Sequence, residues 1–418
     1  MFKNIFKALK AGAFLALLAY AAALFALPDE LHMKTGGVSR FSSPLPIFAT
    51  ITPESAEVIR VDGSPVTQNI TINLRDGADI EAAGEGQARL DINLFGRPLK
   101  SVPIQVSERA MLIPCGMCFG VRLNTSGVMV LGTGEVQTAA GSVRPAGDCL
   151  RSGDLILSVN GRPLTRKDEL ISAVEGSSGD ITLSVRRDGL ELTERLSPAV
   201  DWADNRRKIG VWVRDAAQGI GTITYLNPAG GGFGALGHGI ADVDTRRLLP
   251  VKDGEVYRAE ITSVKMGRKG APGELIGNIK KQSIIGTVEK NSEYGVFGRV
   301  YGVSAGRAPL PVAAPDEVHD GPARILSSVY GDSPREYDVY IESVNRFSGD
   351  RMKSMVVRVT DPDLLKRTGG IVQGMSGSPI IQDGRLAGAL THVFVREPEK
   401  GYGIFAADML KAEGNGFL

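Results

Sequence analysis

Histidine, cysteine and aromatic residues are scarce in this chain of 418 residues, which has 4 histidines, 3 cysteines and 6% aromatic residues. A metal centre made of histidine and cysteine ligands therefore has few residues to use. A reaction that needs an imidazole has equally few choices, because its histidine must be His32, His238, His319 or His392.

An excess of charge of one sign is also absent. The chain has 48 Lys and Arg against 47 Asp and Glu, which gives a formal net charge of +1. A balanced chain lacks the basic surface that nucleic-acid binding requires, so we expect no nucleic-acid partner. Its 43% apolar and 23% charged residues are typical of a folded globular protein, and its length indicates about two or three domains.

The three cysteines, Cys115, Cys118 and Cys149, form an odd set, so at least one is unpaired or pairs with another chain. The C-x-x-C spacing of Cys115 and Cys118 is found in zinc and redox sites, but the sequence offers no second pair of ligands to complete such a site. We therefore expect small core-packing cysteines, with no metal and no other cofactor.

One long uncharged hydrophobic run lies near the N-terminus. Residues 11–27 follow Lys3, Lys7 and Lys10 and end at Pro28. A basic flank, an apolar stretch and a polar exit predict a transmembrane signal anchor over residues 1–31. Cleavage at an A-x-A-like site within the run is the alternative, and either form places the bulk of the chain outside the cytoplasm.

The next part of the chain shows no residues with an evident chemical role. Residues 32–55 are rich in Pro, Ser, Gly and Thr with weak periodicity, so we expect a flexible stalk. Residues 56–109 contain alternating segments such as 70–74 and 90–95, which predict a small β region.

Residues 110–200 have a more specific pattern. Residues 147–161 read G-D-C-L-R-S-G-D-L-I-L-S-V-N-G, and the final N-G pair is a strong hairpin signal. A helix should follow, with Leu170, Ile171 and Val174 on its buried face. This order resembles a PDZ domain, a module that binds a peptide as an added strand.

The PDZ resemblance implies a loop of backbone N–H groups, just before the second strand, that captures the carboxylate of a peptide. In this sequence the loop would be Gly116, Met117, Cys118, Phe119 and Gly120. Self-association through the module is a further expectation. The alternative is a groove that the chain's own segments block, or one that serves only packing.

Residues 201–418 contain many short apolar segments separated by Gly, Pro, Asn and Asp, without an alternation of strands and helices. This pattern predicts a barrel or a sandwich. The fold class that we expect for the whole chain is mainly β, with an N-terminal membrane helix, a PDZ domain and a C-terminal chymotrypsin-like β-barrel domain.

Residues 374–379 read G-M-S-G-S-P. The pattern G-x-S-G-x-P resembles the nucleophile segment of chymotrypsin-like serine proteases, in which small residues leave room for the substrate and the turn aims backbone N–H groups at an oxyanion. Ser376 would be the nucleophile and Ser378 a small flanking residue. A tight turn between two strands is the alternative.

A serine hydroxyl needs a base that accepts its proton and a group that orients the base. His238 lies in the segment G-A-L-G-H-G-I, where glycines leave the imidazole uncrowded, and is the base that we expect. His392 alternates within a strand and is the reserve base. His319 lies in a polar loop and His32 lies in the expected stalk.

The orienting carboxylate is less constrained by the sequence. Asp361 lies at the end of an apolar strand, where Pro362 fixes the following turn. Asp363, Asp242 and Asp244 are competitors, and spacing alone leaves the choice open.

Three segments together resemble the stage IV sporulation protein B peptidase family of endospore-forming bacteria. They are G-A-L-G-H ending at His238, V-T-D-P-D-L-L with Asp361, and T-G-G-I-V-Q-G-M-S-G-S-P-I-I with Ser376. The resemblance covers the anchor, the PDZ module and the C-terminal peptidase. It implies a triad of His238, Asp361 and Ser376, and analogy with other serine proteases implies an oxyanion hole made by the N–H groups of Gly374 and Ser376.

The resemblance also implies a biological role. Members of the family are made in the forespore and exported into the space between the two membranes around it. They cut themselves in the N-terminal region and cleave a membrane-bound regulator of an intramembrane protease, which activates a late mother-cell sigma factor. Two rival functions are a non-catalytic PDZ scaffold and a general envelope quality-control protease, although the latter usually carries its PDZ module after the protease domain.

Overall fold

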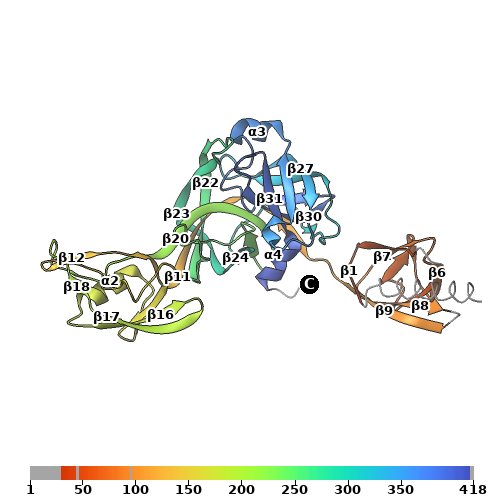
Figure 1. The fold of residues 1–418 in the computed structure, drawn as a ribbon. Helices are drawn as coiled ribbons and strands as arrows, with labels where there is room; N and C mark the ends of the chain where they lie inside the picture. The colour runs from red at the N-terminus through yellow and green to blue at the C-terminus, as the bar shows by residue number, and fades with distance from the viewer. Residues whose placement is uncertain (1–29, 44–46, 95–96, 415–418) are drawn as a thin grey trace, which may run out of the picture. The chain divides into compact units, whose positions relative to one another are not determined.

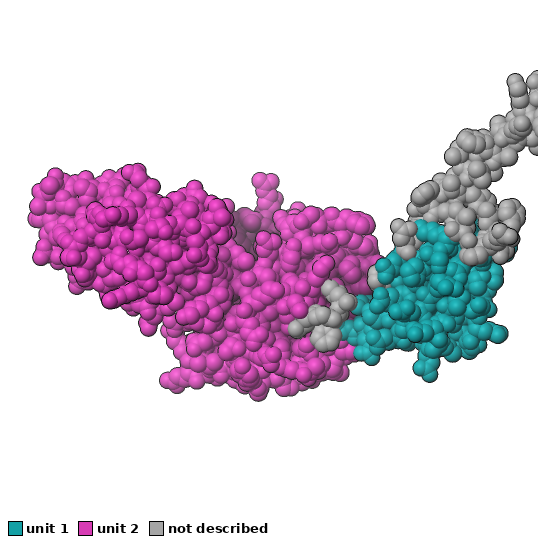
Figure 2. All heavy atoms as spheres, turned by 90° about the horizontal axis from the view of Figure 1, so that it is seen from below, with its two compact units in different colours: residues 1–110, 417–418 teal, residues 111–416 magenta. Residues whose placement is uncertain are grey.

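The computed structural model describes residues 30–43, 47–94 and 97–414, and the described chain is mainly β (Figure 1). The expected membrane helix lies outside the described residues, apart from its last two positions. Within the described part, no helix is long and apolar enough to cross a bilayer. The described residues up to 110 and those from 111 onward form two compact units, coloured separately in Figure 2, and each is described by itself.

The first unit consists of two β-sheets around an apolar core. One sheet has the order β1 (Leu31–Lys34), β9 (Arg97–Ser107), β8 (Gly86–Leu94), β3 (Phe48–Pro53) and β6 (Ile70–Asn73). The other has the order β2 (Val38–Phe41), β7 (Ala78–Ala82), β4 (Ile59–Val61) and β5 (Ser64–Pro65). The expected β region is therefore present, and it begins earlier than residue 56.

The stalk prediction for residues 32–55 is wrong, because β1, β2 and β3 lie within these residues and belong to the two sheets. Several apolar residues of this segment, among them Phe41, Ala49 and Ile51, are buried in the core of the unit. Only two residues of β3 are buried, so the alternation of apolar and polar residues along this strand is short. Such a short alternation is too weak to predict a strand from the sequence.

Six antiparallel strands of the second unit form a first closed barrel, because each strand pairs with the next and the last pairs with the first. Its core includes Phe119 and Phe233, whose rings meet edge to face with centroids 6.1 Å apart. The strands in order around the barrel are β11 (Cys118–Thr133), β22 (Val251–Lys265), β23 (Glu274–Ser292), β24 (Gly295–Val300), β21 (Gly232–Ala235) and β20 (Val211–Leu226).

A smaller module is inserted into this barrel. Strand β11 continues beyond the barrel to pair with β14 (Leu155–Val159), and β20 leads the chain back into the barrel. Its helix α2 (Lys167–Glu175) buries Leu170 and Val174 as expected, but Ile171 is 45% exposed. Asn160 and Gly161 both have positive φ, which the tight hairpin turn requires. The elements of the module are β12 (Val136–Thr138), β13 (Gly141–Val143), β14 (Leu155–Val159), β15 (Arg162–Pro163), α2 (Lys167–Glu175), β16 (Ile181–Arg187), β17 (Leu190–Leu196), β18 (Ala199–Val200) and β19 (Arg207–Lys208).

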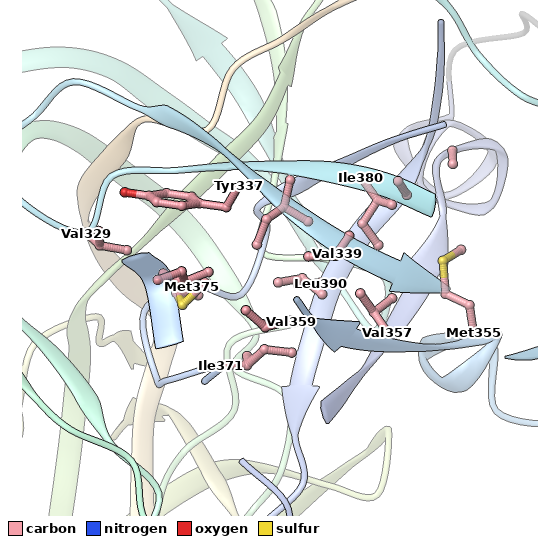
Figure 3. Packing of buried hydrophobic residues seen from close by; sticks show 14 of the residues in the cluster. Val329, Tyr337, Val339, Met355, Val357, Val359, Ile371, Met375, Ile380 and Leu390 are labelled. Atoms are coloured by element: carbon pink, nitrogen blue, oxygen red, sulfur yellow. The ribbon is translucent and has the colours of Figure 1, made fainter. Parts of the chain in front are cut away.

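The second barrel follows in the chain, and its interior is packed with aliphatic side chains such as Val339, Val357, Ile380 and Leu390 (Figure 3). Its strands are β26 (Gly321–Ser327), β27 (Arg335–Val344), β28 (Met355–Val359), β31 (Lys400–Phe405), β30 (Arg385–Val393) and β29 (Pro379–Gln382), in order around the barrel. The remaining elements are β10 (Met111–Pro114), β25 (Leu310–Pro311), η1 (Arg351–Lys353), α3 (Pro362–Thr368) and α4 (Ala406–Glu413).

Candidate active site

Residues from both barrels line a cleft of about 500 Å³. His238 comes from the segment after β21 of the first barrel, and Ser376 comes from the loop before β29 of the second. Gly374, Thr391 and His392 also line the cleft. The structure thus brings together the expected nucleophile, the expected base and the reserve base, which lie far apart in the sequence.

The backbone around Ser376 includes two N–H groups that have no acceptor in the described part of the chain. The N–H groups of Gln373, Met375, Gly377 and Ser378 donate to the carbonyls of Gly273, Val372, Leu390 and Met375 at 2.8–3.1 Å. Among the described residues, no acceptor is found for the N–H groups of Gly374 and Ser376. These are the two donors expected for an oxyanion hole. Gly374 and Ser376 both line the cleft, as does Gln373 of the same loop.

Two glycines allow the loop to take this shape. Gly374 and Gly377 have φ of 97° and 95°, a region that side chains with a Cβ rarely adopt. A Cβ on Gly377 would also lie 2.2 Å from the carbonyl oxygen of Thr222 and 2.5 Å from the N atom of Leu236. The glycines of the motif are therefore required by the backbone conformation and by the close packing of the two barrels.

The two serines of the motif have different surroundings. Ser378 is fully buried, and its hydroxyl has no hydrogen-bond partner within the described part of the chain. Ser376 is partly exposed and lines the cleft, and its Oγ donates to the carbonyl of Thr391 at 2.6 Å. Only Ser376 of the pair is accessible to a substrate, and its hydroxyl must rotate away from Thr391 before it donates its proton to an imidazole.

The ring of His238 is held by a backbone carbonyl, since its Nδ1 lies 2.9 Å from the oxygen of Gly239. An imidazole that donates from Nδ1 keeps Nε2 unprotonated, which is the tautomer that a general base needs. The pKa of His238 is lowered to about 4, chiefly by desolvation; the Gly239 hydrogen bond acts in the opposite direction, and the neighbouring His392 adds a smaller lowering effect. His238 is therefore neutral at pH 7.

His392 lies beside His238, with ring centroids 5.1 Å apart. It is more exposed than His238, and its pKa is lowered by desolvation, with the Asp350 carboxylate acting in the opposite direction. The structure thus places the reserve base at the rim of the same cleft.

Asp361 is not brought into the cleft. It is the N-cap of α3: its Oδ1 accepts from the N–H of Leu364 at 2.8 Å, and its Oδ2 accepts from the N–H of Asp338 at 3.4 Å. Proline at the first helical position and this capping aspartate explain why a helix begins here. No hydrogen bond between a carboxylate and His238 is found among the described residues.

The competing carboxylates do not fill this position either. The buried carboxylate of Asp242 bonds Arg214 and caps the turn that follows it, and the exposed Asp244 pairs with the same arginine. Asp363 lies exposed in the first turn of α3. Outside the cleft, His319 pairs with Asp383 at 2.8 Å, and His32 is part of β1.

The loop expected to capture a peptide carboxylate lies elsewhere. Gly116 donates to the carbonyl of Ile223, Cys118 donates its thiol hydrogen to the carbonyl of Ala259, and Phe119 lies in the core of the first barrel. Residues 116–120 therefore lead into and begin β11 of the first barrel and do not line the groove of the inserted module, so the prediction that they form the peptide-binding loop is wrong. The glycines of this segment mark close packing, since a Cβ on Gly116 would lie 2.5 Å from Leu326.

The groove of the inserted module lies beside α2 and was missed in the sequence. It has a volume of about 460 Å³ and is lined by Ile171 and Val174 of the helix and by residues 206–213. Gly210 has a φ of 65° between two apolar residues, Ile209 and Val211. This apolar-Gly-apolar pattern at the start of β20 is the sequence signal that could have located the groove. Ile171 is exposed because it lines the groove.

The surroundings of the two cysteines in the C-x-x-C pair make their thiols unreactive. Cys115 and Cys118 are buried, and desolvation raises the pKa of their thiols to about 11 and about 12. Cys149 is less buried and its thiol donates to the carbonyl of Arg195.

Comparisons with known proteins identify the class of protein that this site defines: the chain is a serine endopeptidase. Residues 205–410 match the family model described as SpoIVB peptidase S55, and this half of the chain belongs to that family. None of the curated proteins is a significant match.

Several solved structures resemble parts of the chain. A PDZ domain of the SdrC-like protein of Listeria monocytogenes is 19% identical, with 21% of this chain and 87% of that chain covered and a TM-score of 0.18. The Rv3671c protease of M. tuberculosis in an inactive form is 15% identical, with 46% and 81% covered and a TM-score of 0.28. The HtrA-type protease AlgW with a decapeptide is 13% identical, with 51% and 57% covered and a TM-score of 0.28.

Proposed function

We propose that Ser376 is the nucleophile and His238 the general base of a chymotrypsin-like peptidase built from the two barrels. The observation that carries this proposal is the loop around Ser376, whose free N–H groups on Gly374 and Ser376 lie in one cleft with a neutral imidazole. Peptide hydrolysis needs this combination of nucleophile, base and oxyanion donors.

The chemistry follows from these positions. Ser376 Oγ leaves the carbonyl of Thr391, transfers its proton to Nε2 of His238 and attacks the scissile carbonyl. The N–H groups of Gly374 and Ser376 stabilise the oxyanion. The imidazolium of His238 then protonates the leaving amine, and a water molecule activated by His238 hydrolyses the acyl-enzyme.

Asp361 is kept in the proposal as the orienting carboxylate on the family resemblance alone. In the structure it caps α3, so reaching His238 requires the start of this helix to move. The variant that tests it is Asp361→Asn, which keeps a capping side chain. Loss of activity at an unchanged melting temperature assigns Asp361 to the triad, and wild-type activity leaves His238 oriented by the Gly239 carbonyl.

The cleft favours an uncharged substrate segment. Of the described residues that line it, none is Asp, Glu, Lys or Arg, and apolar side chains such as Ile220, Ile371 and Val393 are among them. A charged side chain bound here would lose hydration without gaining a partner of opposite charge. We therefore propose that the residues flanking the cleaved bond are mainly apolar or uncharged.

The biological proposal rests on the family. We propose a sporulation-specific peptidase, anchored by residues 1–31 and exported into the space between the two membranes around the forespore. Its substrates are its own N-terminal region and a membrane-bound regulator whose cleavage activates a late mother-cell sigma factor. The match of residues 205–410 to the SpoIVB peptidase family supports this role.

The experiment that tests the proposal compares the N-termini of purified full-length wild type and Ser376→Ala by mass spectrometry. New N-termini in the wild type, absent from Ser376→Ala, identify self-cleavage and the residues around the cut. A non-catalytic scaffold predicts identical N-termini in both proteins and intact signalling by Ser376→Ala. A quality-control protease predicts rapid digestion of unfolded casein, which a signalling peptidase leaves largely intact.

A further inference from the structure

Thr222 lies where the loop that carries Ser376 meets the segment that carries His238. It belongs to β20 of the first barrel and is 1% exposed. Its side chain and its backbone both bond across the boundary between the two barrels.

Three hydrogen bonds of Thr222 connect the two catalytic segments. Its Oγ1 donates to the carbonyl of Gly374 at 2.8 Å, and its N–H donates to the carbonyl of Ser376 at 3.3 Å. Its own carbonyl accepts from the N–H of Leu236, two residues before His238, at 3.2 Å. One residue therefore contacts the backbone on both sides of the reaction centre.

The hydroxyl bond acts on one peptide plane, the plane between Gly374 and Met375. The carbonyl of this plane accepts from Thr222, and its N–H, on Met375, donates to the carbonyl of Val372 at 3.1 Å. Glycine at 374 has no Cβ to restrict rotation, so these two bonds are what holds the plane. This plane lies between the two peptide planes that carry the N–H groups of Gly374 and Ser376. Without the hydroxyl, the link between these two donors loses one of its two hydrogen bonds.

We propose that the Thr222 hydroxyl is a positioning group that keeps the oxyanion donors on Gly374 and Ser376 aimed into the cleft. Catalysis by such donors depends on their being fixed before the reaction, because reorienting them during the reaction costs free energy. Thr222 does not touch the substrate; it acts through the backbone of the Ser376 loop. This inference rests on the proposed roles of Ser376 and Gly374.

The same strand offers a matched control. Thr224 lies two residues further along β20 and is also buried, but its hydroxyl has no hydrogen-bond partner among the described residues. Replacing Thr224 by valine removes a hydroxyl of the same kind from the same strand without breaking a bond. A difference between Thr222→Val and Thr224→Val therefore reports the hydrogen bond to Gly374.

The experiment measures labelling of the full chain by a fluorophosphonate-rhodamine probe, whose phosphonyl oxygen occupies the oxyanion hole. We expect Thr222→Val to lower kinact by about 10- to 100-fold with KI little changed, less than the roughly 100- to 1,000-fold loss on deleting an oxyanion donor. Thr222→Ser should restore most of the rate, and Thr224→Val should label like wild type. The melting temperature of each variant corrects for the unfolded fraction.

The outcomes separate the inference from the proposed function. Wild-type labelling of Thr222→Val, or an equal loss in Thr222→Ser, overturns the positioning role. If Thr222→Val does not fold, the comparison of Thr222→Ala with Thr222→Ser supplies the same contrast. Continued labelling of Ser376→Ala contradicts the assignment of the nucleophile itself, whatever the Thr222 variants do.

Discussion

The pKa of His238 makes a prediction about the pH dependence of acylation. Desolvation lowers this pKa to about 4, against an ordinary value of 6.5. The neutral imidazole is the active form, so activity is present above the pKa and lost as the pH falls through it. The peptidase should therefore remain active at acidic pH values that inactivate a base with an ordinary imidazole.

The size of the effect follows from the fraction of neutral imidazole. At pH 5.5 a base with a pKa of about 4 is about 97% neutral, whereas one with the ordinary pKa of 6.5 is about 9% neutral. The two cases differ about tenfold in rate relative to pH 8. This difference is large enough to measure with a covalent probe.

The assay is the second-order rate of fluorophosphonate labelling of the full chain between pH 3.5 and pH 8, corrected for hydrolysis of the probe. We expect a midpoint near pH 4 in wild type. His392→Ala should keep substantial activity with a midpoint shifted upward, because a neighbour that lowers the pKa of His238 is removed. A midpoint near 6.5, or loss of labelling in His392→Ala while His238→Ala remains active, refutes the assignment of the base.

Three further predictions concern packing and reactivity. Gly377→Ala should lower the melting temperature and abolish labelling, because the added Cβ would lie 2.2 Å from the Thr222 carbonyl oxygen. Gly384→Ala is the control: Gly384 also has a positive φ, 73°, but no atom beyond its chain neighbours lies within 4 Å of an added Cβ, so this variant should keep labelling. Iodoacetamide at pH 8 should alkylate Cys149 faster than the buried Cys115 and Cys118, as peptide mapping will show. Asp361→Ala should lower the free energy of unfolding by about 1 kcal/mol through loss of the α3 cap, and denaturant unfolding that shows no change contradicts this capping role.

Short motifs carried the sequence-based prediction of the site. Ser376 could be found because its loop needs glycine at two positions with positive φ, which leaves a recognisable pattern. His238 could be found because histidine is scarce and glycines surround it. Thr222 could not be found, because its role depends on a bond to Gly374, 152 positions away in the sequence.

Long-range strand pairing was the part of the fold that the sequence concealed. β11 and β20 each serve both the first barrel and the inserted module, so the boundaries of the module fall inside strands, where composition does not change. For this reason the sequence indicates a peptide-binding loop at residues 116–120, although these residues lead into and begin β11 of the barrel. Local signals such as the Asn160-Gly161 turn were reliable because they depend only on neighbouring residues.

The most direct test of the central claim is to identify the residue that a fluorophosphonate modifies in the full chain, by peptide mass spectrometry. The account predicts an adduct on Ser376 in wild type and none in Ser376→Ala, while Ser378→Ala is still labelled because Ser378 is buried and outside the cleft. An adduct on another residue, or equal labelling of Ser376→Ala, contradicts it.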